Sequence, residues 1–369
     1  MKRTKNILVD IGHPAHVHLF RNFIEEMKSR GHKIFVLTKE VDSIIQLLDN
    51  YEIAYTTLGR KPDSLLSKYF FQILITLKTI LFARKHKIDA GIGISMTLPI
   101  VAGFTPLLTF GMDDDDTAAT PVFAKFINKC DCILTPDCIN ENRGIKHILY
   151  PSYHELAYLH PNRFVPDPAV LIEAGIKKNE PFFVLRFNAF KAHHDSGMKG
   201  LNKEQKQKLV NLLKVYGKVF ITSEKKIEPE FESYRLPVSP EKIHSLLYYA
   251  KMFVGDSQTM TTEAAMLGTP AFKCNSFAGK LSIPNEIENK YQLCFSYLPG
   301  DFDKMLRNIQ NHLEMPGLEE VFVKRRNQML QDKIDLTSFL VYLVDQFPAS
   351  ATKVHDKVFI RNLYNPSVA

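Results

Sequence analysis

Short apolar runs alternate with amphipathic segments along most of the chain. A short apolar run bounded by polar residues or glycine is typical of a buried strand, whereas apolar residues that recur every three or four positions predict a helix. The runs predict strands at Ile7–Asp10, Lys33–Thr38, Ile53–Thr57, Asp89–Ile94, Leu107–Gly111, Cys130–Leu134, Phe182–Arg186, Lys218–Thr222, Met252–Gly255, Ala271–Cys274 and Leu293–Ser296. Because helical segments separate these strands, we predict an α/β protein with doubly wound parallel sheets.

The helical segments and a proline-rich stretch predict the domain organisation. Helices are expected at His16–Arg30, Val41–Asp49, Leu65–Lys87 and Ala118–Asn128, and as two closing helices within Leu318–Phe347. The stretch from His160 to Pro181 has little periodicity and is typical of a linker. We therefore expect Rossmann-like domains over residues 1–165 and 166–347 and a tail over residues 348–369. Ligands of such domains bind at the carboxyl edges of the sheets, which predicts a cleft between the two domains.

Length and composition limit the classes of protein to which the chain can belong. A length of 369 residues, with 45% hydrophobic and 24% charged residues, favours a globular protein of two domains. The first apolar run is broken by Asp10, and no segment approaches about 18 uncharged apolar residues, so neither a signal peptide nor a membrane span is expected. Five cysteines without a disulfide rhythm favour the cytoplasm. The net charge of +7 is scattered, and no nucleic-acid partner is expected.

The segment Gly255–Pro270 combines a strand end, a polar turn and a helix with a small face. The first backbone N–H groups of such a helix favour a phosphate. Ser257, Gln258 and Thr259 are therefore candidates for binding the phosphates of a nucleotide substrate. Glu263 lies about two turns into the helix, where a carboxylate could accept hydrogen bonds from ribose hydroxyls. The alternative is a crossover helix with an ordinary surface glutamate.

Three histidines occupy the loop after the first strand, within the segment Gly12–His18. The carboxyl end of a first strand is a common place for chemistry in α/β proteins. His16 and His13 are the candidate catalytic residues, because an imidazole titrates near neutral pH and can act as a general base. Two alternatives stay open, namely metal binding and a structural role in helix capping and packing.

A second polar loop, Arg186–Asp195, follows the first strand of the second half. Arg186 and Lys191 are candidate ligands of a diphosphate, because both cations bind phosphate oxygens. His193 and His194 could add hydrogen-bond donors. The alternative is a solvated basic loop.

Four consecutive aspartates, Asp113–Asp116, follow the strand Leu107–Gly111. Such a run could bind Mg²⁺ or could begin the next helix, with Asp115 or Asp116 as its N-cap. No metal is expected to be required. Asp113 and Asp116 are kept as candidates for contact with an acceptor substrate.

The segment Leu65–Lys87 is apolar and carries a basic end. A crossover helix buried against the sheet is one interpretation. The other is a helix that docks peripherally on a lipid surface.

The residues resemble those of the GT-B superfamily of nucleotide-sugar enzymes. The opening ILVDIGHPAHVHLFRNFIEEMKSRGHKI is similar to that of the N-acetylglucosaminyltransferase that makes the peptidoglycan lipid precursor, and the alignment places His16 on that family's loop histidine. The segment Asp256–Ala264 resembles a motif of the non-hydrolysing UDP-N-acetylglucosamine 2-epimerases. This resemblance implies that Ser257 and the amides of Gln258 and Thr259 hold a diphosphate, with Glu263 on the ribose.

The chain also resembles an archaeal and bacterial family defined only as a domain of unknown function, which shares the patterns HPxHVHxF and TMxTEAAxLGTP. Together these resemblances imply a GT-B glycosyltransferase with a nucleotide-sugar donor, UDP-linked, that acts in surface polysaccharide or glycoconjugate synthesis. The N-terminal domain would face a glycan or lipid-linked acceptor, and the C-terminal domain would bind the donor. The enzyme would need no cofactor and would be cytoplasmic, with peripheral contact at the inner membrane face left open. The alternatives are a 2-epimerase-like isomerase and a non-catalytic nucleotide-sugar-binding protein.

Overall fold

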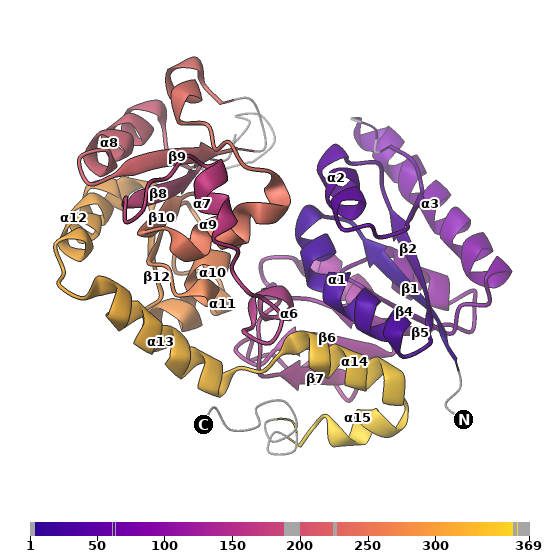
Figure 1. Ribbon diagram of the computed structural model, residues 1–369. Helices are drawn as coiled ribbons and strands as arrows, with labels where there is room; N and C mark the ends of the chain where they lie inside the picture. The colour runs from indigo at the N-terminus through magenta and orange to yellow at the C-terminus, as the bar shows by residue number, and fades with distance from the viewer. Residues whose placement is uncertain are drawn as a thin grey trace. The chain divides into compact units, whose positions relative to one another are not determined.

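The chain divides into two α/β units in this computed structural model (Figure 1). One unit comprises Met1–Arg163 and Lys333–Ala369, and the other comprises Phe164–Asp332. The structure describes residues 4–60, 62, 64–187, 200–223, 227–356 and 360. Each unit has its own sheet and its own core.

The first unit has, in the ranges described, a seven-stranded parallel sheet with the order β3-β2-β1-β4-β5-β6-β7. Its strands are β1 (Asn6–Ile11), β2 (Lys33–Thr38), β3 (Thr56–Thr57), β4 (Ala90–Gly93), β5 (Leu108–Met112), β6 (Cys132–Pro136) and β7 (His147–Tyr150). Its helices are α1 (Pro14–Ser29), α2 (Asp42–Asn50), α3 (Leu65–Lys85), α4 (Thr97–Ala102), α5 (Pro121–Ile127), α6 (Leu156–Leu159), α14 (Leu336–Gln346) and α15 (Ala349–Lys353).

The second unit has a five-stranded parallel sheet, counted over its described residues, with the order β12-β11-β10-β8-β9. Its strands are β8 (Phe182–Arg186), β9 (Lys218–Thr222), β10 (Met252–Gly255), β11 (Ala271–Cys274) and β12 (Cys294–Tyr297). Its helices are α7 (Ala169–Glu173), α8 (Lys203–Leu213), α9 (Ile243–Tyr249), α10 (Gln258–Leu267), α11 (Ser282–Glu286), α12 (Phe302–Leu313) and α13 (Leu318–Asp332). Short 3-10 helices lie at Pro229–Tyr234, Pro240–Lys242 and Pro299–Asp301, and a π-helical turn lies at Ile287–Tyr291.

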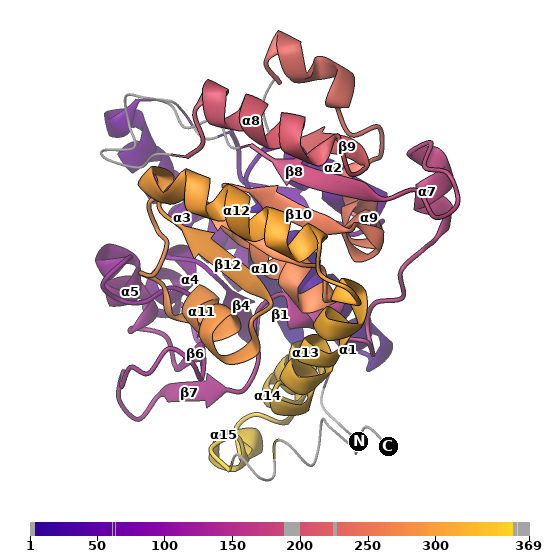
Figure 2. The same cartoon turned by 90° about the vertical axis from the view of Figure 1, so that its left-hand side faces the viewer.

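Each sheet buries apolar side chains against helices, as the periodicity predicts. In the first unit, Leu8 of β1 and Leu37 of β2 share a core cluster with Ile75 and Ile80 of α3. In the second unit, α8 and α12 lie side by side over one face of the sheet (Figure 2), where their apolar residues join those of β8, β10 and β11 in a single cluster. The α/β architecture with doubly wound parallel sheets is therefore confirmed.

Most predicted elements are present within a few residues of their predicted bounds, but no bounds were predicted for β7, α4, α6, α7, α8, α9, α11, α12 and α15. Strand β7 and helix α4 are short and lie in stretches without clear periodicity. Helix α5 begins at Pro121 with Thr120 as its N-cap residue, so neither Asp115 nor Asp116 caps it. The sequence boundary near residue 165 lies close to the observed division between Arg163 and Phe164.

The closing helix α14 belongs to the first unit, whereas the sequence placed residues 333–347 in the C-terminal domain. Arg163 explains part of this placement, because its Nε donates a 2.6 Å hydrogen bond to Asp335 Oδ2 at the start of α14. The Nζ atom of Lys5 donates a 2.8 Å hydrogen bond to the carbonyl of Val344 near the helix end. The chain thus returns to its first unit through contacts that are distant in sequence.

A glycine stands beside the reversal of strand order in both sheets. Gly93 of β4 pairs with Asp10 of β1, and Gly255 of β10 pairs with Arg186 of β8. A Cβ atom on Gly93 would lie 2.8 Å from the Asp10 carbonyl oxygen, and one on Gly255 would lie 2.4 Å from that of Arg186. These are the positions where open α/β sheets bind their ligands. The residues around these two glycines therefore form the candidate site.

Candidate functional site

The first polar group at the edge of the N-terminal sheet joins β1 to the loop after β4. Ser95 Oγ donates a short hydrogen bond to the Asp10 carboxylate and also accepts one of 2.9 Å from the Thr97 N–H. Burial raises the pKa of Asp10, although the hydrogen bond from Ser95 and the charge of Lys39 act in the opposite direction. Asp10 is thus a carboxyl group at the reversal of strand order whose surroundings favour its protonation.

The histidine loop lies beside this carboxylate at the start of α1. His13 is the N-cap residue of α1, and its Nδ1 atom accepts a 3.2 Å hydrogen bond from the Ala15 N–H. His18 is buried, and its Nδ1 atom lies 3.2 Å from the hydroxyl of Tyr51. His13 therefore caps the helix and His18 packs within the unit, which are the structural roles left open for this loop.

His16 has a different environment from its two neighbours. Its Nδ1 atom accepts a 3.3 Å hydrogen bond from the Gly12 N–H, so the proton of the neutral ring resides on Nε2. Burial lowers the pKa of His16 to about 3, and the nearby His13 adds to this effect. A neutral imidazole with a protonated Nε2 is a hydrogen-bond donor. This geometry favours donation over proton abstraction by His16.

Asp114 and His154 form a pair at the same edge of the sheet, after β5 and β7. The Nδ1 atom of His154 lies 3.1 Å from Asp114 Oδ2, and His154 Nε2 is buried without a hydrogen-bond partner in the described residues. Burial lowers the pKa of His154, but the charge and hydrogen bond of Asp114 outweigh this and raise it above its ordinary value. Burial acts to raise the pKa of Asp114, but His154 lowers it overall.

The charges of this pair act on His16, because Asp114 raises the pKa of His16 and His154 lowers it. With Nδ1–H directed at the carboxylate, His154 keeps its lone pair on Nε2 when the ring is neutral. That arrangement orients an imidazole for general base catalysis. Asp114 was predicted only as a member of the acidic run, and His154 was not among the predicted site residues.

The other aspartates of the run have separate surroundings. Asp113 is buried, and its Oδ2 atom lies 2.6 Å from Nη1 of Arg143 in a buried ion pair. The carbonyl of Asp116 accepts hydrogen bonds from the N–H groups of Ala119 and Thr120. Asp113 is thus held by Arg143, and Asp114 is the member of the run that pairs with the imidazole of His154. Over the residues described, no group of three His, Cys, Asp or Glu side chains is arranged to hold a metal ion.

At the edge of the second sheet, the turn between β10 and α10 is tied to the end of β8. The Asp256 N–H donates a 3.1 Å hydrogen bond to the Arg186 carbonyl. Ser257 is the N-cap residue of α10, and its Oγ accepts a 3.4 Å hydrogen bond from the Met260 N–H. The N–H groups of Gln258 and Thr259 open the helix, where no carbonyl of a preceding turn can bind them. This is the helix start that the sequence predicted as a phosphate site.

A buried lysine lies beside that helix start. Lys273 of β11 is fully buried, and its Nζ donates a short hydrogen bond to Oε1 of Gln258. Burial lowers the pKa of Lys273 to about 8. A cation held at the N-terminus of a helix strengthens the attraction for an anion. Lys273 was not among the predicted site residues, although a lysine within an otherwise apolar strand is a signal that the sequence contains.

Arg186 and Glu263 have partners of their own. Nη1 of Arg186 donates a 3.2 Å hydrogen bond to Thr222 Oγ1 at the end of the adjacent strand β9. Glu263 is only 4% exposed, and its Oε1 atom lies 3.0 Å from Nε2 of His244 in α9. Glu263 is therefore not an ordinary surface residue. The other donor-side candidates, Lys191, His193 and His194, lie outside the described residues.

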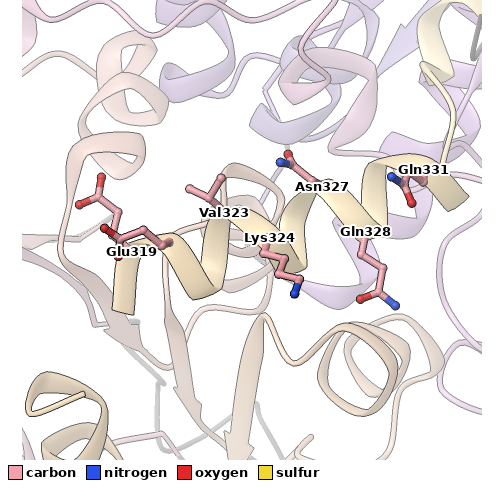
Figure 3. Close-up of a pocket in the computed structure, with 7 residues that line it drawn as sticks. Glu319, Val323, Lys324, Asn327, Gln328 and Gln331 are labelled. Carbon is pink, nitrogen blue, oxygen red and sulfur yellow. The ribbon is translucent and has the colours of Figure 1, made fainter. Parts of the chain in front are cut away.

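A hollow on the surface of α13 contains none of the residues of these two sheet edges. The residues that line it all belong to this one helix (Figure 3) and are Glu319, Glu320, Val323, Lys324, Asn327, Gln328 and Gln331. It is formed by one exposed helix face with mixed charges. We assign no chemistry to it.

Comparison with known proteins shows the family to which this chain belongs. Residues 5–293 match the family described as "Protein of unknown function (DUF354)". The chain belongs to the DUF354 family. This DUF354 protein is also 25% identical over 293 residues to the uncharacterized protein MJ0665 of Methanocaldococcus jannaschii, a match that covers 73% of this chain and 81% of that protein. The family relation predicted from the motifs is confirmed.

Solved structures similar to this DUF354 protein share its fold at low sequence identity. A Staphylococcus aureus MnaA–UDP complex matches with a TM-score of 0.67 and 9% identity, over 94% of this chain and 98% of that one. The spinosyn forosaminyltransferase SpnP matches with a TM-score of 0.63 and 13% identity, over 96% and 100%. A UDP-N-acetylglucosamine 2-epimerase matches with a TM-score of 0.62 and 11% identity, over 93% and 98%. The GT-B fold is confirmed, a fold used by nucleotide-sugar enzymes.

Proposed function

We propose that this DUF354 protein is a glycosyltransferase of the GT-B type that uses a nucleotide-sugar donor, UDP-linked, in surface polysaccharide or glycoconjugate synthesis. The observation that carries the proposal is that anion-binding groups lie at one sheet edge and acid–base groups lie at the other. The edge of the second unit has a helix start and cations, as a diphosphate requires. The edge of the first unit has an oriented carboxylate–imidazole pair, as proton transfer requires.

The donor is assigned to the second unit. The N–H groups of Gln258 and Thr259 and the hydroxyl of Ser257 would bind the diphosphate, with Lys273 supplying a positive charge beside the helix start. Arg186 would add charge-assisted hydrogen bonds from the end of β8. These groups would stabilise the negative charge that develops on the departing diphosphate. The proposal also includes a contact of Glu263 with the ribose. Further diphosphate contacts are proposed for Lys191, His193 and His194.

Proton transfer is assigned to the first unit. His154 Nε2 would accept the proton of an acceptor hydroxyl, while Asp114 orients the ring and stabilises the imidazolium that forms. His16 would donate a hydrogen bond from Nε2 to a substrate oxygen. Asp116 and the Asp10 carboxyl group are proposed to contact the acceptor, a glycan or a lipid-linked glycan, whereas the other predicted acceptor contact, Asp113, is held in its ion pair with Arg143.

A 2-epimerase-like isomerase is the second candidate. It is supported by the structural similarity to a UDP-N-acetylglucosamine 2-epimerase and by the presence of several acid–base groups at one edge. Such an enzyme needs an acid and a base near one sugar carbon but no second substrate. The two candidates therefore differ in their requirement for an acceptor.

The first experiment measures thermal unfolding of the full chain with UDP and UDP-N-acetylglucosamine, with AMP as the control nucleotide. A ligand at about 100 times its Kd stabilises a protein by about 2.7 kcal/mol, which corresponds to a rise in Tm of about 5–10 °C for a unit of this size. We expect this stabilisation with the uridine ligands alone. No rise with either uridine ligand would contradict the proposed function.

The second experiment separates the two candidates. UDP release from UDP-N-acetylglucosamine is measured with and without a lipid-extracted glycan fraction, and the sugar nucleotide is analysed for a new epimer. Glycosyl transfer predicts UDP release only when the acceptor fraction is present. A new epimer without an acceptor would support the isomerase instead.

A further inference from the structure

The outer face of α3 carries a continuous apolar stripe on the surface of the first unit. Its members are large side chains that are 43–66% exposed, namely Tyr69, Phe70, Ile73, Leu74, Leu77 and Leu81. They recur every three or four residues and therefore share one side of the helix. The opposite side is also apolar, but Ile75, Ile80 and Ala83 are buried in the core. Helix α3 is thus apolar on the side that the core does not cover.

The stripe continues onto the turn that follows α4. Nη2 of Arg84, near the end of α3, donates a 3.0 Å hydrogen bond to the carbonyl of Phe104, and the Phe104 side chain is 60% exposed. We call the six α3 residues and Phe104 the α3 patch. A contiguous group of large exposed apolar side chains is typical of an interaction surface.

The charged residues along α3 and the turn that follows it have one sign. No Asp or Glu occurs from Ser64 to Ile88. In the same stretch Lys78, Arg84, Lys85 and Lys87 are exposed. An apolar helix face with a cationic border is complementary to an anionic bilayer, which offers hydrocarbon beneath a layer of negative headgroups. Aromatic residues such as Tyr69 and Phe70 favour the interface between the two.

We propose that the α3 patch docks this protein on the surface of an anionic lipid bilayer, with α3 lying in the plane of the interface. Within the described part of the chain, no helix is long and apolar enough to cross a membrane. Apolar side chains enter the outer hydrocarbon while the lysines and Arg84 remain at the headgroups. This inference is independent of the proposed function, because it requires neither a nucleotide nor an acceptor.

The test is co-sedimentation of the full chain with vesicles of phosphatidylcholine alone or of phosphatidylcholine with phosphatidylglycerol. The main variant is Leu74→Glu/Leu77→Glu, and its control is Ile145→Glu, an exposed apolar residue of the same unit outside the α3 patch. We expect the wild type and the control to bind anionic vesicles, with about tenfold or greater loss in the double variant. Lys85→Glu is expected to weaken binding several-fold, and added salt is expected to weaken it in every case.

Unfolding temperature and mass by light scattering are measured for each variant. The substituted side chains are exposed, so an unchanged Tm is expected. Absence of binding to both vesicle types, or equal binding by the double variant, would overturn the proposal. A dimer in solution that the double variant dissociates, without vesicle binding, would also overturn it and would assign the α3 patch to a second copy of the chain.

Discussion

The Nδ1 atom of His154 lies 3.1 Å from the Oδ2 atom of Asp114, although the two residues follow different strands of the N-terminal sheet. The pairing holds the imidazole in one orientation and leaves Nε2 buried without a partner among the described residues. Because burial alone would lower the pKa of His154, the raised pKa depends chiefly on the charge and hydrogen bond of Asp114, with smaller contributions from Glu155 and Asp113. The pair is therefore a candidate acid–base device whose properties can be tested by removing either member.

His154→Ala is expected to reduce turnover by about 10²–10⁴-fold, the usual contribution of a general base, while UDP binding is unchanged. His355→Ala, an exposed histidine of the same unit, serves as the control. Steady-state rates and calorimetry with UDP are the measurements. Full activity of His154→Ala would exclude His154 as the base.

Asp114→Asn is expected to move the pH dependence of the rate. A base must be neutral, so the wild-type rate rises with pH through the raised pKa of His154. Without the carboxylate, burial dominates and lowers that pKa, so the rise should occur at lower pH with a smaller maximum rate. The measurement is a pH–rate profile of kcat/KM for both proteins. An unchanged profile would separate Asp114 from the chemistry.

His16→Gln and His16→Ala distinguish a hydrogen-bond donor from a base. Burial lowers the pKa of His16 to about 3, and the Gly12 N–H bonds to Nδ1, so the ring presents Nε2–H. A glutamine amide can replace this donor but cannot accept a proton. We expect His16→Gln to retain clearly more activity than His16→Ala in kcat assays. Equal and large losses in both variants would favour a base role for His16.

Lys273→Met is expected to weaken UDP binding by about 10- to 100-fold, the equivalent of a hydrogen bond to a charged group. Methionine is chosen because it approximates the buried volume of the lysine stem. Burial lowers the pKa of Lys273 to about 8, so its charge, and with it the wild-type affinity, should decline as the pH rises above this value. Calorimetry across this range should show a weaker pH dependence in the variant. Lys280→Met, an exposed lysine, is the control.

Glu263→Ala is expected to lower stability as well as UDP affinity. The carboxylate is buried against His244, and loss of a hydrogen bond to a charged group costs about 1.5–3 kcal/mol. The alternative of an ordinary surface glutamate is wrong, because Glu263 is only 4% exposed. Denaturant unfolding and calorimetry measure the two effects, and Glu319→Ala on α13 is the control. Normal UDP affinity in a folded Glu263→Ala variant would contradict the ribose assignment.

Local patterns in the sequence were sufficient for the architecture. The bounds of β2, β8, β9, β10 and β11 agree with the apolar runs, because buried parallel strands read as short continuous apolar segments between turn residues. The turn at Ser257 and the helix after it were predicted by local signals, since an N-cap and its helix are neighbours in the chain.

Contacts between distant segments decided the rest. Lys273 reaches Gln258 because parallel pairing places β11 beside β10, and Asp114 meets His154 because β5 and β7 end at the same edge of their sheet. The sequence indicated an acidic run and a histidine loop, but it could not show that Asp113 pairs with Arg143 and leaves Asp114 for the imidazole. Side-chain partners of this kind depend on strand order and register, and these are properties of the folded sheet rather than of any local segment.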